Sequence, residues 1–285
     1  MVNIRKYWQG PNVEILAVRV ARFVAVGMIV LLCEAGALAA TITVTTTADD
    51  ITPNDGSVSL REAITAINAG NDLGDPDIVA QNPGTFGPID TINFNIPGTG
   101  VMTINVGTNA SASGIPLPKI IKPVVINGYS QPGSRVNTLG TGDNGVLLIQ
   151  LSGASAGSGA NGLVLGSGSA GSTVRGLVIN QLGRNGIVIE SDGNTIAGNF
   201  IGSDPTGTAP GPGNANNGVL VDGATGNSIG GPALEDRNVI AFNGADGVKI
   251  GNAVANNLLL CNGATAIDFN GIAVTGNNDV EKCKK

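Results

Sequence analysis

Few side chains in this 285-residue chain could carry out catalytic chemistry, and histidine is not among them. Without histidine, Ser–His catalysis, Cys–His catalysis and histidine-ligated metal sites are all excluded. Carboxylates remain, and glycoside hydrolysis needs two of them about 5–9.5 Å apart around the scissile bond. The candidates in the second half of the chain are Glu190, Asp192, Asp204, Asp222 and Asp246. They are scattered along the sequence, so each is most simply a solvated turn residue and the sequence favours a non-catalytic protein.

A short acidic segment, residues 71–77, contains three carboxylates that could hold Ca²⁺ through oxygen ligands: Asp72, Asp75 and Asp77. Their spacing does not match an EF-hand loop, and Pro76 lies between two of them. A solvated acidic turn is therefore the favoured interpretation, and we expect no bound cofactor.

The composition argues against a nucleic-acid partner and against long helices. The net charge is −6, which disfavours binding to a polyanion. The chain contains 44 Gly, a poor helix former. Aromatic residues make up 3% of the chain and apolar residues 42%, so the core is expected to be aliphatic.

The first 40 residues have the pattern of an export signal. Basic residues precede an apolar run over 23–32, and the small residues of 37–39 would suit a signal peptidase. The run is shorter than the about 20 residues that a membrane span needs; a membrane anchor or a buried helix is the alternative. We expect residues 1–40 to be removed near Ala39 or Ala40. The mature chain, without a transmembrane segment, would be secreted or associated with the cell surface or outer envelope.

Two cysteines remain after this cleavage, Cys261 and Cys283. An oxidising compartment permits a disulfide between them, which would join the lysine-rich tail of residues 276–285 to the rest of the chain. Two unpaired thiols are the alternative, because the sequence does not show whether their Cα atoms come within about 6 Å.

A repeated unit after residue 140 predicts the fold. The unit is Asn-Gly or Asp-Gly followed by alternating apolar residues, and it begins at Asn144, Asn161, Asn185, Asn217 and Asp246. The last four starts are 24, 32 and 29 residues apart, and each interval holds about three short strand-like segments. This period predicts coils that stack as a parallel β-solenoid over residues 81–275, each adding about 4.8 Å. We attribute the Asn-Gly and Asp-Gly pairs to turns with positive φ.

Two further features of the repeats are structural. Asn194 and Asn227 occupy the same turn position in neighbouring coils, where their amides could form a hydrogen-bonded ladder. The stretches 202–213 and 231–237 interrupt the pattern with Gly and Pro, and we predict that both are surface loops.

Residues 41–80 are predicted to form an N-terminal cap. Residues 41–47 alternate as a strand does, and Ser59 and Glu62 have the spacing of a capping box. The apolar pattern that begins at Leu60 predicts an amphipathic helix of about ten residues, ending near Gly70. A helix over the first coil would block the open edge of the solenoid; an independent binding helix is the alternative.

The segment 44–67, above all Ser59-Leu60-Arg61-Glu62-Ala63-Ile64, resembles the CSLREA domain at the start of exported bacterial proteins. Residues 117–120 and 125–133 are similar to the stretch that follows this domain, and the repeats resemble those of the pectate-lyase-like superfamily. The resemblance implies an all-β, right-handed parallel β-helix (solenoid) with a short N-terminal capping α-helix, exported from a bacterium, but no settled activity. Val58 stands where the Cys that names the domain is expected, so a disulfide of that Cys is not expected.

We therefore expect an exported, non-catalytic structural or adhesion module of the cell surface or extracellular space, with surface glycans or other envelope proteins as partners. Few aromatic side chains could stack against sugars: Phe86, Phe94, Tyr129, Phe200, Phe242 and Phe269. The alternative is a small polysaccharide lyase or glycoside hydrolase for an acidic polysaccharide, in which Asp204 or Asp222 would act with Arg184.

Overall fold

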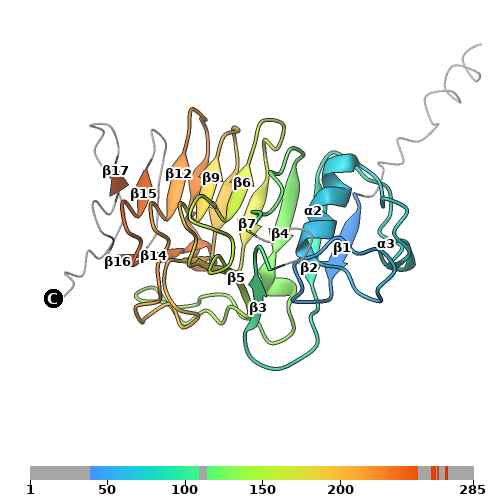
Figure 1. Cartoon of the computed structure of the whole chain (residues 1–285). Helices are drawn as coiled ribbons and strands as arrows, with labels where there is room; N and C mark the ends of the chain where they lie inside the picture. Colours follow the sequence, from blue (N-terminus) through green and yellow to red (C-terminus); the bar gives the residue numbers. More distant parts are fainter. Residues whose placement is uncertain (1–38, 109–113, 250–257, 261, 263–266, 269–285) are drawn as a thin grey trace, which may run out of the picture. The chain divides into compact units, whose positions relative to one another are not determined.

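The computed structural model describes residues 39–108, 114–249, 258–260, 262 and 267–268, and most of their regular structure is β (Figure 1). The strands form three sheets. The first sheet has the order β1 (Thr41–Val44), β2 (Asp90–Phe94), β4 (Val124–Asn127), β7 (Thr173–Arg175), β10 (Thr195–Ala197) and β13 (Ser228–Ile229). The second has the order β3 (Met102–Asn105), β5 (Ile149–Ser152), β8 (Leu177–Asn180), β11 (Phe200–Ile201), β14 (Val239–Ala241) and β16 (Leu258–Leu260). The third has the order β6 (Leu163–Leu165), β9 (Ile187–Ile189), β12 (Val219–Val221), β15 (Val248–Lys249) and β17 (Ile267–Asp268).

The described helical elements are short. They are the α-helices α2 (Leu60–Ala69) and α3 (Pro76–Ala80) and the 3-10 turns η1 (Gly128–Ser130) and η2 (Leu234–Asp236).

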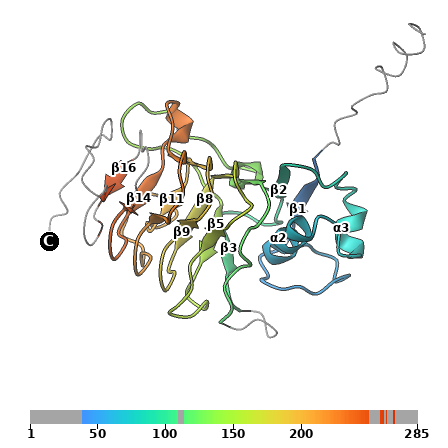
Figure 2. The same ribbon diagram turned by 90° about the horizontal axis from the view of Figure 1, so that it is seen from above.

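The chain visits the three sheets in rotation, which can be followed in Figures 1 and 2. Strands β7, β8 and β9 belong to the first, second and third sheets, and β10 then returns to the first sheet as the parallel neighbour of β7. Strands β11 and β12 repeat this step beside β8 and β9. The mostly β, parallel architecture predicted from the repeat period is therefore confirmed.

Columns of aliphatic side chains form the core between the sheets. In the first sheet the strand register aligns Ile42, Ile92, Ile126, Val174, Ile196 and Ile229. The second sheet aligns Ile104, Leu151, Ile179, Ile201 and Ile240, and the third aligns Leu163, Ile187, Val219 and Val248. All of these side chains are at most 1% exposed. Removing this aliphatic surface from water is the main favourable contribution to the stability of the fold.

The Asn-Gly pairs are needed for a reason other than the positive φ suggested by the sequence. None of Gly162, Gly186 and Gly218 has a positive φ. A Cβ atom on Gly186 would instead lie 2.7 Å from the carbonyl oxygen of Gly218, and one on Gly218 would lie 2.6 Å from that of Gly247. Glycine lets the backbones of successive coils approach this closely because it has no Cβ.

The asparagines before these glycines form a ladder of side-chain amides. Asn217 Nδ2 donates to Asn185 Oδ1 at 3.0 Å, and Asn185 Nδ2 donates to Asn161 Oδ1 at 2.9 Å. The ladder expected at Asn194 and Asn227 is also present, with Asn194 Nδ2 donating to Asn227 Oδ1 at 3.0 Å. Other ladders join Asn199 to Asn238, Asn214 to Asn243, and Asn243 to Asn262. These amides are thus paired along the direction in which the coils stack, although Nδ2 of Asn227 has no partner among the described residues.

The predicted surface loop 202–213 covers part of a smaller apolar cluster on the second sheet. This cluster consists of Leu147, Val178, Phe200, Val239 and Ala241. Gly207 lies so close to the Phe200 ring that a Cβ atom would be 2.9 Å from Cε2. The loop therefore adds to the buried apolar surface.

The predicted loop 231–237 contains η2 and anchors another loop. Arg237 is 8% exposed, and its guanidinium donates to the carbonyl oxygens of Gly140 at 2.8 Å, Leu139 at 3.2 Å and Gly142. The repeat unit expected at Asn144 lies just beyond these carbonyls. There Val146 forms an antiparallel bridge to Arg135, whereas the later repeat units lead into strands of the third sheet.

Helix α2 packs its apolar face into the core at the first coil, where Leu60, Ile64 and Ile67 join the same cluster as Ile42 and Ile92. The capping box is present, since Glu62 N donates to Ser59 Oγ at 3.1 Å and Ser59 N donates to Glu62 Oε2 at 2.7 Å. The helix ends at Gly70, which has a left-handed φ of 73°.

Residues beyond α3 satisfy the edge of β1. Gln81 accepts from Thr43 N at 2.7 Å and donates to Thr43 O at 2.8 Å, so its amide imitates a neighbouring strand. Thr41 N donates to Pro83 O at 2.8 Å. This bonding blocks edge-to-edge pairing with another chain.

The close approach at the Asn-Gly corners predicts the effect of a single methyl group. Gly186→Ala should lower the free energy of unfolding by about 1–3 kcal/mol, because the new Cβ would meet Gly218 O. Gly159→Ala is the matched control, since a Cβ there meets nothing within 4 Å. Urea denaturation followed by circular dichroism measures both; equal stability of the two variants would contradict this explanation.

Candidate functional site

The structure does not bring the three candidate catalytic residues together. Arg184 lies between β8 and β9 and Asp204 lies between β11 and β12, so both are at the corner between the second and third sheets. Asp222 follows β12 at the other end of the third sheet. Because β9 and β12 are parallel neighbours, Arg184 and Asp222 flank opposite ends of adjacent strands.

The carboxylate of Asp204 is used within its own loop. Thr206 Oγ1 donates to it at 2.8 and 2.9 Å, and Ala209 N donates to it at 3.2 Å. This is the local bonding of a turn residue.

The three acidic residues proposed for Ca²⁺ bind backbone N–H groups instead of converging. Asp72 Oδ1 accepts from Gly74 N at 2.9 Å, and Asp77 Oδ2 accepts from Gly56 N at 2.9 Å. Asp75 is the N-cap of α3, and its Oδ1 accepts from Asp77 N at 2.9 Å.

Helix α3 was not predicted, because this acidic segment was interpreted as a solvated turn. The pair Asp75-Pro76 is nevertheless a helix-start signal, with Asp as N-cap and Pro at the first helical position. Within the described part of the chain, no group of three or more acidic or cysteine residues is placed to hold a metal ion.

Several expected features lie outside the described residues. They are residues 1–38 of the export signal expected over 1–40, the cysteines Cys261 and Cys283, the tail over 276–285, and Phe269.

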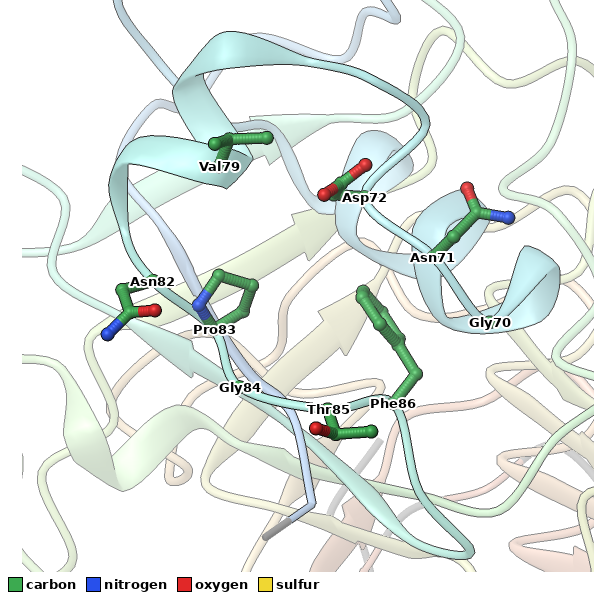
Figure 3. Close-up of a pocket in the computed structure, with 9 residues that line it drawn as sticks. All are labelled: Gly70, Asn71, Asp72, Val79, Asn82, Pro83, Gly84, Thr85 and Phe86. Atoms are coloured by element: carbon green, nitrogen blue, oxygen red, sulfur yellow. The ribbon is translucent and has the colours of Figure 1, made fainter. Parts of the chain in front are cut away.

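A pocket of about 390 Å³ lies where the end of α2 meets the chain after α3 (Figure 3). Its lining residues are Gly70, Asn71, Asp72, Val79, Asn82, Pro83, Gly84, Thr85 and Phe86. Figure 3 shows the ring of Phe86 reaching into the space between the two segments, with Asp72 on the opposite side. We call this the Phe86 pocket.

The Phe86 pocket combines one aromatic face with a few hydrogen-bonding side chains. Phe86 is half-buried against the core, whereas Phe94 and Phe200 are each 1% exposed and cannot meet a ligand. The carboxylate of Asp72 and the amides of Asn71 and Asn82 can bond hydroxyl groups. A sugar ring, which has an apolar face and hydroxyl groups at its edge, fits such a lining.

Sequence reasoning missed this pocket, although Phe86 was counted among the aromatic residues available to sugars. The signal that could have helped is the pair of turn segments, 70–74 and 82–84, flanking a short helix. Their side-by-side placement depends on the Gln81 and Pro83 contacts with β1, which no local pattern shows.

A buried ion pair connects α2 to the first coils. Arg61 Nε and Nη2 donate to the two carboxylate oxygens of Asp49, each at 2.8 Å, and the two side chains are 5% and 0% exposed. Arg61 also donates to the carbonyl oxygens of Ile115 and Pro116, while Asp49 accepts from Gly107 N. This network fixes the cap on the coils, because every charged atom in it has a partner.

Glu62, next to this ion pair, is buried without a cation. The pKa of Glu62 is raised to about 7, chiefly by desolvation and to a smaller extent by the neighbouring carboxylates of Asp50 and Asp75, against the lowering effect of its hydrogen bonds with Ser59. Burial also raises the pKa values of Asp50 and Asp143 above the usual range.

Comparison with known proteins adds no family to this picture. A scan against protein-family models finds no match, and a search of curated proteins finds no matching sequence. None of the helices in the described segments is both long enough and apolar enough to cross a membrane.

The raised pKa of Glu62 predicts that the folded chain becomes less stable as the pH rises from about 4.5 to 7. Over that range Glu62 ionises in the unfolded chain but stays protonated in the folded one, so the unfolded state is favoured. The loss is on the order of 3 kcal/mol, since a tenfold change in an ionisation constant is about 1.4 kcal/mol. Glu62→Gln keeps the capping box and should flatten this dependence. Urea denaturation at pH 5 and pH 8 measures it; an unchanged slope in the variant would contradict the assignment to Glu62.

Proposed function

We propose that this chain is an exported, non-catalytic module of the bacterial cell surface or extracellular space that binds glycans in the Phe86 pocket. In this proposal it is a right-handed parallel β-helix with a CSLREA-like N-terminal cap, and it acts in structure or adhesion. The observation that carries the proposal is the Phe86 pocket itself, where an accessible aromatic face lies opposite a carboxylate and between two amides.

The bonding of the polar side chains supports a non-catalytic role. A hydrolase would need two opposed carboxylates, and a lyase would need a free basic group beside its substrate. Asp204 is bound within its loop, and Asp222 and Arg184 lie at opposite ends of adjacent strands. The amides at the coil corners are engaged in ladders rather than facing a cleft.

The charge of the Phe86 pocket favours a neutral glycan. Asp72 contributes a negative charge, and no basic residue is among the nine that line the pocket. The Nζ atom of Lys122 lies beside Gly70, so this cation and Asp72 offset each other, and a glycan without net charge fits best. This preference separates the proposal from the alternative, an enzyme that acts on an acidic polysaccharide.

The glycan proposal predicts that binding depends on Phe86. Phe86→Ala should weaken binding to a neutral oligosaccharide by about threefold to tenfold, the size of one aromatic contact. Phe86→Leu keeps an apolar side chain against the core but removes the aromatic face, so it should weaken binding without a large change in melting temperature. Glycan-array screening of the full chain, followed by isothermal titration calorimetry with the best ligand, measures the effect.

Ile89→Ala is the matched control, because Ile89 is a 44% exposed apolar residue that is not among those lining the pocket. The proposal fails if no neutral glycan binds, or if Phe86→Ala binds as tightly as the unchanged protein. Release of reducing or unsaturated ends from acidic polysaccharides would support the enzyme instead.

A further inference from the structure

The N-terminal cap carries a second pocket, of about 220 Å³, that shares no lining residue with the Phe86 pocket. It is lined by Ile51, Pro53, Glu62, Thr65, Leu73 and Asp75. We call it the Glu62 pocket. Its residues come from the segment before α2, from α2 itself and from the connection to α3.

Two of the lining residues are carboxylates that are almost completely buried. Glu62 and Asp75 are each 3% exposed. Glu62 Oε2 accepts from Ser59 N, but the buried Oε1 has no hydrogen-bond partner. The neighbouring Asp50 also has a buried oxygen, Oδ1, without a partner. A buried acceptor left unpaired costs free energy, and Glu62 both lines the pocket and carries such an acceptor.

The charges around Glu62 have the same sign as its own. Asp50 and Asp75 both disfavour its ionisation, and the hydrogen bonds at the start of α2 do not offset this, since its pKa stays above the usual range. The adjacent Arg61 does not compensate, because its guanidinium is bound to Asp49 and to backbone carbonyls. The pocket therefore lacks positive charge.

The other side of the lining is apolar and accessible. Ile51 is 54% exposed and Leu73 is 46% exposed, and Pro53 lies with them in the wall. Large apolar side chains at this exposure around a pocket favour a ligand that has an aliphatic part. The lining therefore suits a ligand that has both a short alkyl chain and a hydrogen-bonding cation.

We propose that the Glu62 pocket binds a primary alkylammonium group, with the ammonium beside Glu62 and Asp75 and the alkyl chain against Ile51, Pro53 and Leu73. An ammonium group has three donors and one positive charge, which suit two neighbouring carboxylates of which one, Glu62, has an oxygen without a partner. A metal ion suits them less well, since the described residues provide no group of three or more ligands placed to hold one. A lysine side chain and a free amine both carry this group.

The test titrates n-butylammonium into the full chain at pH 8 and follows the backbone amides by two-dimensional NMR. We expect saturable shifts at the amides of the Glu62 pocket, and no such shifts with 1-butanol, which has the same chain without the charge. Glu62→Gln should weaken binding at least tenfold while keeping the capping box. At pH 5 the unchanged protein should also bind more weakly, because Glu62 is then protonated.

Two further variants keep the proposal falsifiable. Leu73→Ala removes part of the apolar wall, so it should weaken n-butylammonium more than methylammonium. Asp222→Asn is the matched charge control on an exposed residue far along the chain and should leave binding unchanged. Absence of saturable shifts, equal shifts with 1-butanol, or unchanged binding by Glu62→Gln would each overturn the proposal. These outcomes are independent of Phe86→Ala, so failure here and failure of glycan binding can be told apart.

One more ligand distinguishes a lysine side chain from a free amine as the source of the ammonium group. Nα-acetyl-lysine methylamide carries the same ammonium on a peptide-like backbone. Tighter binding of this ligand than of n-butylammonium would support a lysine of a partner protein, and equal binding would support a free amine.

Discussion

The close approach of one coil of backbone to the next at the Asn-Gly corners is the constraint on which the rest of this structure depends. The carbonyl oxygen of Gly218 lies only 2.7 Å from where a Cβ of Gly186 would be, and that of Gly247 lies 2.6 Å from where a Cβ of Gly218 would be. That approach keeps the corners aligned from coil to coil, and aligned corners keep the strands in register. Register in turn places aliphatic residues over aliphatic residues in each sheet. A single enlarged corner would therefore disturb the packing of the whole column above and below it.

The same alignment limits where chemistry can occur. Side chains at the corners point along the stack at a fixed spacing, so asparagine amides there are satisfied by their copies in the next coil. A side chain held in such a ladder is not free to bind a ligand or to transfer a proton. Segments outside the regular coils escape this limit. In the described residues these are the inserted loops and the N-terminal cap; the Glu62 pocket lies in the cap, and the Phe86 pocket lies where the cap meets the segment before β2.

Much of the fold could be predicted because it repeats. The Asn-Gly period indicated parallel coils, and Ser59 and Glu62 indicated both the start of α2 and its capping box. The physical role of the glycines could not be predicted, since it depends on the carbonyl of a residue about thirty positions away. The unit at Asn144 differs from the later units for a related reason. Its local sequence matches the repeat, but Val146 pairs with Arg135, and the preceding loop is held by Arg237, which lies far along the chain. The pockets were missed because each joins segments whose neighbourhood is set by single long-range contacts, such as the bonds of Gln81 to Thr43.

The N-terminal cap ends the stack of coils through two kinds of contact, an apolar core under α2 and a network of paired polar groups beside it. Arg61 and Asp49 are buried, yet each charged atom is paired, so they position α2 without leaving a charge to be solvated. Glu62 directly follows Arg61 in the sequence and is equally buried, but its Oε1 atom has no hydrogen-bond partner in the described part of the chain. The capping box needs a single oxygen of Glu62, so the helix alone does not account for the second. Gln at this position would form the same capping box without a buried acid. The presence of Glu where Gln would serve the helix is therefore the feature of the cap that folding alone leaves unexplained, and the alkylammonium ligand proposed above would account for it.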